Sequence, residues 1–157
     1  MTAISVKNLV KTYGSVSALD GLNLEVPGGS VFGFLGPNGA GKTTTLRILA
    51  GLAKATSGRV TIAGVELKNT TPKPSRLVGY LPEEPAFYPW MTPLEYLRYA
   101  ATIFGIHKEE AANKAEKLLE LVGLTEVKKW KIGGFSRGMR QRLGIAQALV
   151  NDPEILL

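Results

Sequence analysis

Apolar and polar residues alternate through the first half of the chain at the two-residue period of β-strands. The alternation is loose over residues 3–10, before a break at Tyr13-Gly14, and strict over residues 22–26, which end at Pro27-Gly28-Gly29. Both patterns predict half-buried strands. Three shorter apolar runs are also expected to be strands, with a proline-bearing loop between the last two. The runs are 31–35, 59–63 and 77–81, and the loop is 70–75.

The apolar period becomes that of a helix after residue 91. The segment Thr92-Pro93-Leu94-Glu95 has a threonine at the N-cap, a proline at the first helical position and a glutamate three residues after the threonine. This is the pattern of a capping box. It predicts a helix that runs to about Phe104 and stops at Gly105.

Two further helices and one strand are predicted in the second half. One helix covers about 108–122 and ends at Gly123, and the other begins near Ser136 and ends at about residue 150. Residues 154–157 begin another apolar strand. The first of these helices carries five apolar residues on one face, which are expected to pack in the core. They are Ala111, Ala115, Leu118, Leu119 and Val122.

The segment Gly36-Pro37-Asn38-Gly39-Ala40-Gly41-Lys42-Thr43 matches the phosphate-binding loop pattern without a mismatch. The pattern requires a buried strand before the loop and a helix after it. The run 31–35 is typical of a central parallel strand. Apolar residues at helical spacing after the loop predict a helix that ends at Gly51. Both flanks of the pattern are therefore present.

The residue types of this loop suit a triphosphate. Glycine lets the backbone curl so that its N–H groups point at phosphate oxygens, and the following helix N-terminus adds a positive dipole. The Lys42 ammonium is expected on the β- and γ-phosphates, and the Thr43 hydroxyl is a ligand for Mg²⁺. The alternative is a glycine-rich turn with a solvated lysine, which the matching context disfavours. The residues expected to bind nucleotide here are Gly36, Pro37, Asn38, Gly39, Ala40, Gly41, Lys42, Thr43 and Thr44.

Composition narrows the class of protein. The 157 residues are 45% hydrophobic and 20% charged, as in a soluble globular protein. No apolar run reaches the length that a bilayer span needs, and the N-terminus lacks a secretion signal. Absence of cysteine excludes disulfides and thiolate metal sites. The net charge of +6 allows an acidic partner, but only Lys128-Lys129-Trp130-Lys131 is clustered, so a solvated basic surface is expected.

The order of motifs along the whole chain resembles the nucleotide-binding domain of ATP-binding cassette (ABC) proteins. It runs from Tyr13 through the phosphate loop and a loop at Glu83 to the segment 135–139 and the strand at 154–157. Other phosphate-loop enzymes share the first motif and lack the rest. The resemblance implies an α/β fold of the P-loop NTPase class. A RecA-like parallel-sheet core, here incomplete, would carry an antiparallel β lobe and a helical lobe.

Two of the motifs concern contacts with nucleotide. In the family an aromatic residue at the place of Tyr13 stacks on adenine, and its Lys-Thr-Tyr-Gly setting favours this role over that of an ordinary strand tyrosine. Residues 135–139, Phe-Ser-Arg-Gly-Met, align with the family signature Leu-Ser-Gly-Gly-Gln and depart from it at three positions. Ser136 can cap the next helix, and Gly138 lets the backbone approach a phosphate.

The resemblance implies that Ser136 and Gly138 contact the γ-phosphate bound by a second copy, across a head-to-tail dimer. The alternative for this segment is a plain capped helix start. The continuation Arg140-Gln141-Arg142-Leu143, as in the family, favours the functional interpretation.

Glu83 stands where most family members have a glutamine that contacts Mg²⁺ or its water and relays the nucleotide state to the transmembrane partner. A glutamate also supplies an oxygen ligand, but it adds negative charge beside the triphosphate. Together with the segments 88–93 and 136–139, Glu83 looks like the export branch of the family. Members of that branch serve drugs, ions or surface polysaccharides.

The family's metal-holding aspartate, water-orienting glutamate and γ-phosphate-contacting histidine would lie beyond Leu157. Hydrolysis of ATP is therefore expected of the intact protein and not of this chain alone, and no catalytic residue is assigned within it. His107, the only histidine, is expected at the surface or at a helix cap.

The resemblance also implies a domain organisation and partners. Residues 1–157 would be a partial ABC ATP-binding domain, with core and β lobe over 1–83, helical lobe over 84–134, and signature helix with the start of the Walker B strand over 135–157. The expected cofactors are ATP and Mg²⁺. The expected partners are a second nucleotide-binding domain and a membrane permease, with the chain at the cytoplasmic face of the membrane. No nucleic acid is expected.

Two alternative functions stay open. One is a nucleotide-binding fragment without turnover. The other is a soluble ABC ATPase that acts on nucleic acid or ribosomes, as the net charge allows. Neither heptads nor cysteines occur between Glu83 and Ser136, and this counts against the DNA-repair type of ABC protein, which carries coiled-coil or zinc-bearing insertions there.

Overall fold

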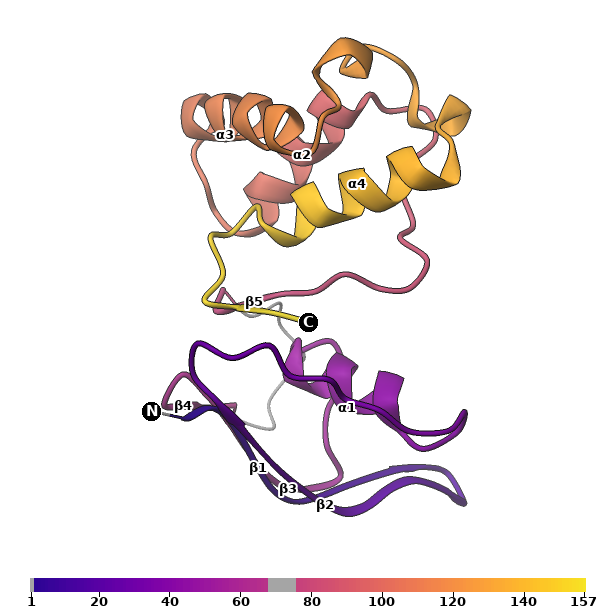
Figure 1. The fold of residues 1–157 in the computed structure, drawn as a ribbon, viewed down its shortest axis with the longest axis vertical. Coiled ribbons are helices and arrows are strands. Elements are labelled where there is room, and N and C mark those ends of the chain that lie inside the picture. The colour runs from indigo at the N-terminus through magenta and orange to yellow at the C-terminus, as the bar shows by residue number, and fades with distance from the viewer. Residues whose placement is uncertain (1, 68–75) are drawn as a thin grey trace. The chain divides into compact units, whose positions relative to one another are not determined.

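The computed structural model describes residues 2–67 and 76–157, so the loop expected over 70–75 lies outside the described residues. The chain divides into two compact units, Met1–Leu77 and Val78–Leu157. Figure 1 labels the helices and most of the strands of both units. No helix in the described ranges is long and apolar enough to cross a bilayer.

Unit 1 is built on a four-stranded antiparallel sheet with the order β2-β1-β3-β4. The first two strands are much longer than the alternating segments from which they were predicted, because antiparallel pairing continues, with several register shifts, past those segments to both strand ends. The strands are β1 (Thr2–Tyr13), β2 (Val16–Pro27), β3 (Ser57–Ile62) and β4 (Val65–Glu66).

A bulge at Asn8 explains why the alternation in the first strand is loose. Ile4 and Val6 are buried at two-residue spacing, but the next buried residue is Leu9. Asn8 lies between them in the left-handed region, with φ 49°, and the pairing with β2 shifts register there. One extra residue returns Leu9 to the core face of the sheet.

The helix predicted after the phosphate loop is α1 (Lys42–Leu49), and it ends before Gly51, which has φ 73°. It buries Thr45, Ile48 and Leu49, and Figure 1 shows it against one face of the four-stranded sheet. Burial of this stripe fixes the direction in which the loop enters the helix.

The prediction of a buried parallel strand at 31–35 was wrong. These residues have no regular secondary structure, and Val31 and Leu35 are 106% and 90% exposed. An apolar run forms a central strand only if neighbouring strands pair with its backbone. In the described part of the chain no strand pairs with this segment.

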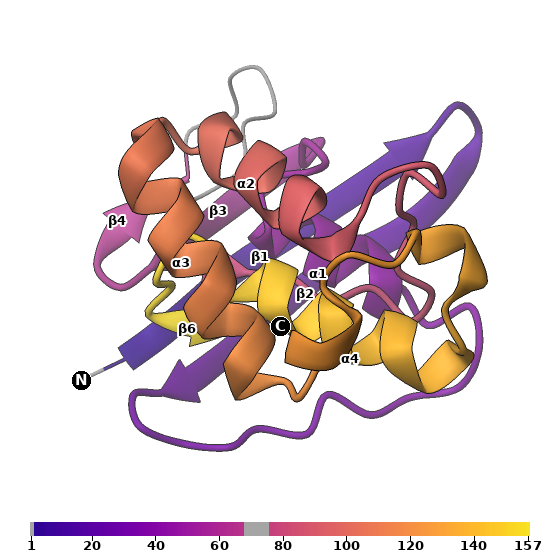
Figure 2. The same ribbon diagram turned by 90° about the horizontal axis from the view of Figure 1, so that it is seen from above.

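Unit 2 combines three helices with a two-stranded parallel sheet. In the sheet, β5 (Val78–Gly79) pairs with β6 (Ile155–Leu156), which lie at the predicted positions but are shorter than the predicted strands. The helices α2 and α3 lie side by side (Figures 1 and 2). The helices are α2 (Pro93–Ile103), α3 (Lys108–Leu121) and α4 (Arg137–Ala148), and two short 3₁₀ turns are η1 (Thr125–Val127) and η2 (Ile132–Gly134).

The helix ends of unit 2 follow their local sequence signals. The capping box is confirmed: Glu95 N donates to Thr92 Oγ1 at 3.2 Å, and Thr92 N donates to Glu95 Oε2 at 2.7 Å. The hydrogen bond from the Thr92 backbone is the main cause that lowers the pKa of Glu95. Gly105 and Gly123, with φ of 73° and 66°, follow the ends of α2 and α3 as predicted.

The core of unit 2 lies between the three helices. The predicted face of α3 is buried over Ala111, Ala115, Leu118 and Leu119, while Val122 is partly buried against the same cluster. A hydrogen bond of 2.9 Å from the Tyr96 hydroxyl to Gln147 Oε1 joins α2 to α4. The stability of this unit therefore depends on the packing of α3 against its neighbours.

We predict that Leu119→Ala destabilises the protein by about 2–5 kcal/mol, because Leu119 is fully buried and its removal leaves a cavity. The matched control is Leu121→Ala on the same helix, where the side chain is 68% exposed, with an expected change below about 0.5 kcal/mol. Urea unfolding followed by circular dichroism measures both. Equal midpoints for the two variants would contradict the assigned core face of α3.

Candidate functional site

The phosphate loop has the backbone conformation that its glycines permit. Gly39 and Gly41 both have φ 84°, in the left-handed region that favours glycine. Within the loop, a hydrogen bond of 3.2 Å from Ala40 N to Pro37 O closes a turn. All residues from Gly36 to Ala40 are exposed. The loop is thus curled and open to a ligand.

Gly41 also lies in close contact with the sheet. A Cβ atom at this position would overlap the Leu19 side chain and would lie 2.7 Å from the Ala18 carbonyl oxygen. Only glycine allows the loop to reach this position against β2 while it turns into α1. The pattern of the loop indicated the residue type, and the structure adds this second reason for it.

The start of α1 offers backbone donors to an anion. Gly41 is its N-cap, no acidic residue lies in its first turn, and no side chain caps it. The N–H groups of Lys42, Thr43 and Thr44 precede the first intrahelical hydrogen bond, which runs from Thr45 N to Gly41 O at 2.8 Å. Such a helix end binds phosphate groups well.

Thr45 stabilises the start of α1 through a buried hydrogen bond. Its side chain is fully buried, and its hydroxyl donates to Gly41 O at 2.9 Å. The hydroxyl therefore does not face a ligand, in contrast to Thr43, which is exposed, and Thr44, which is half-buried. The contact keeps the N-cap in place, and it leaves the Thr43 hydroxyl as the accessible oxygen of the first turn.

Lys42 folds back over the loop. Its Nζ donates to the carbonyl oxygens of Gly36 at 2.5 Å and Pro37 at 2.7 Å. These two contacts hold the ammonium at the start of the curled loop. Phosphate oxygens form stronger, charge-assisted hydrogen bonds than carbonyl groups do. The loop, the helix end and Lys42 together fit a phosphate group of a nucleotide.

Tyr13 lies at the last position of β1 and is 49% exposed. The Lys11 ammonium lies 4.5 Å from the centre of its ring, in a cation–π contact. Residues two apart on a strand share a face, so the sequence Lys-Thr-Tyr already contained the signal for this contact. The β1–β2 turn that follows Tyr13 and the start of α1 lie at the same end of unit 1 (Figures 1 and 2).

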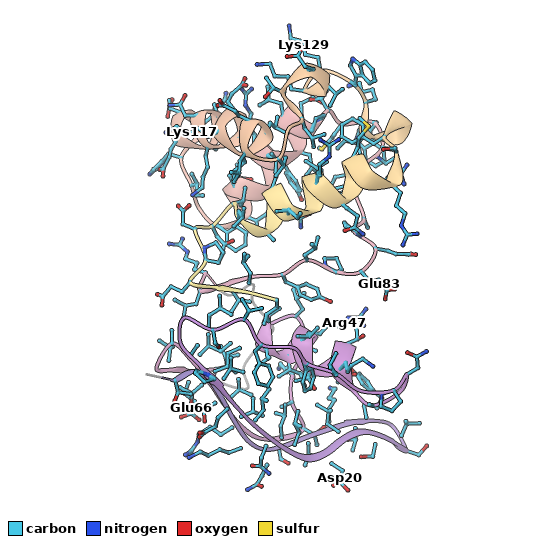
Figure 3. All side chains as sticks on the ribbon, in the orientation of Figure 1. Asp20, Arg47, Glu66, Glu83, Lys117 and Lys129 are labelled. Carbon is cyan, nitrogen blue, oxygen red and sulfur yellow. The ribbon has the colours of Figure 1, made fainter. Side chains whose placement is uncertain are left out.

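The remaining predicted site residues belong to unit 2. Glu83 lies on the loop that follows β5 and is exposed, and Figure 3 shows its side chain on the side of that loop away from α4. Ser136 is the N-cap of α4, and its hydroxyl accepts from Met139 N at 3.2 Å. Around Gly138 a Cβ atom would meet nothing within 4 Å, so the backbone there is open to approach.

The predicted site residues divide between the two units. Tyr13 and the phosphate loop are in unit 1, and Glu83, Ser136 and Gly138 are in unit 2. Thr43 and Glu83, the two predicted metal ligands, are thus in different units. Among the described residues, no group of three or more His, Asp or Glu side chains is placed to hold a metal ion.

Two groups of residues that the sequence singled out have ordinary surroundings. His107 is exposed at the N-cap of α3 and makes no capping hydrogen bond with its side chain. In the basic cluster, Lys128 pairs with Glu116 at 2.8 Å, and Lys131 with Glu95 at 3.7 Å. These ion pairs offset part of the positive charge of the cluster.

Comparison with known proteins assigns the chain to one family, and its relatives have related names. The chain matches the family described as ABC transporter over residues 19–157. It is 46% identical to the bacitracin transport ATP-binding protein BcrA of Bacillus licheniformis, over 99% of this chain and 50% of that protein. It is 40% identical to the Nod factor export ATP-binding protein I of Cupriavidus metallidurans, over 100% of this chain and 52% of that protein. It is 41% identical to the Fe(3+) ions import ATP-binding protein FbpC of Brucella abortus, over 99% and 44%.

Solved structures agree with this result. A nucleotide-free ATP-binding cassette from an ABC transporter superposes with a TM-score of 0.84 at 28% identity, over 99% of this chain and 68% of that chain. A bacterial ABC transporter cassette with a dimeric structure gives a TM-score of 0.83 at 29% identity, over 98% and 72%. The predicted fold class, a P-loop NTPase with an antiparallel β lobe and helices, is confirmed.

We predict that Tyr13→Ala weakens ATP binding by about 1–3 kcal/mol, because an aromatic ring that stacks on a base contributes about this much. Tyr13→Trp should retain binding, since it keeps a stacking surface. The matched control is Val16→Ala, which changes an exposed residue paired with Tyr13 across the same turn. Titration with a fluorescent ATP analogue measures all three. Wild-type affinity in Tyr13→Ala would make Tyr13 an ordinary strand residue.

Proposed function

Because the chain belongs to the ABC transporter family, we propose that it forms part of the ATP-binding subunit of a membrane transporter. The chain spans about half the length of the curated relatives it matches. The activity and partners proposed here are therefore those of the whole protein that contains it. The observation that carries the proposal is the curled loop, in which the Lys42 ammonium bridges two carbonyl oxygens and which leads into a helix start that no side chain caps.

The residues of unit 1 would bind ATP in two places. The backbone N–H groups of the loop and of the first turn of α1 would hold the phosphate groups, and Lys42 would exchange its carbonyl partners for phosphate oxygens. The ring of Tyr13 would stack on the adenine. Lys11 occupies a position over this ring, so the base would take the other face or displace the lysine.

Mg²⁺ is proposed as the second cofactor, and it would neutralise charge on the phosphate groups when bound. Thr43 offers an exposed hydroxyl at the start of α1, and Glu83 offers an exposed carboxylate after β5. Hydroxyl and carboxylate oxygens are the ligand types that Mg²⁺ prefers. Catalysis in this class of enzyme consists mostly of positioning and charge stabilisation, and Thr43 and Glu83 would contribute to it only by holding the metal.

We also propose a head-to-tail dimer in which Ser136 and Gly138 contact the nucleotide bound by a partner copy. The exposed start of α4 and the open backbone at Gly138 support this. The similar bacterial cassette whose structure is dimeric supports it as well. The domain division proposed with it is a core and β lobe over 1–83, a helical lobe over 84–134, and the signature helix with the start of the Walker B strand over 135–157.

The proposed second partner is a membrane permease, with the subunit at the cytoplasmic face of the membrane. Relatives named for transport of bacitracin and export of Nod factor support an export role. A relative of comparable identity is named for import of iron ions. The names of the relatives therefore support a role in transport more strongly than they support export over import. These names also favour transport over the alternative of action on nucleic acid.

We predict that Lys42→Ala abolishes saturable binding of a fluorescent ATP analogue to the full-length protein. Lys42 is the cation held above the loop, and phosphate oxygens would take the place of its carbonyl partners. The matched control is Lys54→Ala, which removes an exposed lysine after α1 and should bind as wild type does. Equal binding by the wild type and Lys42→Ala would refute the proposed nucleotide site.

A further inference from the structure

A hydrogen bond links the loop that carries Glu83 to the helix that carries the signature. The side-chain amide of Gln141 on α4 donates from Nε2 to the backbone carbonyl of Glu83 at 2.7 Å. The two residues are 58 positions apart in sequence, and both belong to unit 2. The bond holds the backbone of Glu83, while the carboxylate stays exposed on the other side of the loop (Figure 3).

The same loop packs tightly against α4 one turn further along the helix. A Cβ atom at Gly144 would lie 2.6 Å from Leu81 Cδ1 and 2.9 Å from Pro85 Cγ. Gly144 is buried, so the residues before and after Glu83 rest directly on the helix surface. Leu81 is fixed at its other side by a hydrogen bond of 2.9 Å from its N–H to Leu157 O.

We propose that Gln141 is a positioning residue that holds Glu83 in place for the bound nucleotide and its metal. The loop contacts α4 at Leu81, Glu83 and Pro85, and these three contacts leave it little freedom to move independently of the helix. The carboxylate of Glu83 would then take its position from the same helix that presents Ser136 and Gly138 at its start. A displacement of α4 would move all three groups together.

This inference rests on the proposed function, since it assumes that Glu83 acts on bound Mg·ATP. It adds a role for Gln141, a residue that is not among those expected to contact the nucleotide. Gln141 would not touch the nucleotide; its amide would act through the Glu83 backbone. A substitution of Gln141 would therefore change only the part of the nucleotide affinity to which Glu83 contributes.

The test uses the full-length protein and three substitutions of Gln141. Gln141→Met keeps the length but removes the donor, Gln141→Glu replaces the donor with an acceptor, and Gln141→Lys restores a donor. Gln141 lines a cavity of about 390 Å³ together with Glu84 and Arg140, which gives these side chains room. The matched control is Gln147→Glu on the same helix, which keeps the acceptor oxygen for Tyr96.

The dissociation constant of a fluorescent ATP analogue is measured for each variant with Mg²⁺ and with EDTA. With Mg²⁺, Gln141→Met and Gln141→Glu should raise it about threefold to tenfold, the value of one hydrogen bond. With EDTA, neither variant should lose affinity relative to the wild type, because Glu83 attracts the nucleotide only through the metal, and without it the carboxylate can only repel the triphosphate. Gln141→Lys and Gln147→Glu should match the wild type in both conditions.

A double-mutant cycle separates positioning from general loosening of the fold. If Gln141 acts through Glu83, then Gln141→Met should add nothing to Glu83→Ala. Equal affinity of Gln141→Met and wild type, an equal loss in EDTA, or additive effects with Glu83→Ala would each overturn the inference. Should Gln141→Glu fail to fold, Gln141→Met with Gln141→Lys decides the matter.

Failure of this inference is distinguishable from failure of the proposed function. Nucleotide binding that depends on Lys42 but not on Gln141 would refute only the positioning role. Binding that does not depend on Lys42 would refute the nucleotide site, and with it the basis of this inference.

Discussion

The contact between Gly41 and strand β2 is the constraint on which the nucleotide-binding part of the structure depends. No side chain fits at this position, because a Cβ atom would overlap Leu19 and press on the Ala18 carbonyl. The loop is thereby fixed to the sheet at the point where it becomes α1, and the buried Thr45 hydroxyl donates to the carbonyl oxygen of Gly41 itself. Because β2 also pairs with β1, the strand that ends at Tyr13 belongs to the same sheet. The phosphate loop and the proposed base-stacking ring are therefore positioned by one framework.

Unit 2 achieves a comparable result with a helix in place of a sheet. Gly144 lets the loop around Glu83 lie on α4, as Gly41 lets the phosphate loop lie on β2. In both cases a glycine removes the side chain that would keep the two elements apart, and a side chain donates a hydrogen bond to a carbonyl oxygen nearby, that of Gly41 in unit 1 and that of Glu83 in unit 2. Loops that carry functional groups are commonly mobile. A glycine at the point of support gives such a loop a defined position, while its functional side chain remains exposed.

The sequence predicted the helices better than the strands, for a physical reason. Helix ends are set by local interactions, such as the capping box at Thr92 and the left-handed Gly105, and these can be recognised within a few residues. A strand needs a partner that the local sequence does not specify, so residues 31–35 had the right composition and yet formed no strand. The loop glycines and Lys42 were recognisable because their chemistry requires a fixed spacing. The bond from Gln141 to Glu83 was not, because it joins residues 58 positions apart.

The contacts of Lys42 show how such a loop can be ordered before it binds a ligand. Its ammonium bridges the Gly36 and Pro37 carbonyl oxygens, and this bridge draws together the start of the loop and the start of α1. Binding of a phosphate would break these two contacts and form stronger ones with charged oxygens. The net affinity is therefore the difference between the two sets of contacts, and it is smaller than the strength of the new set alone. In return, the backbone donors of the loop are already in place when the phosphate arrives, and less conformational entropy is lost on binding.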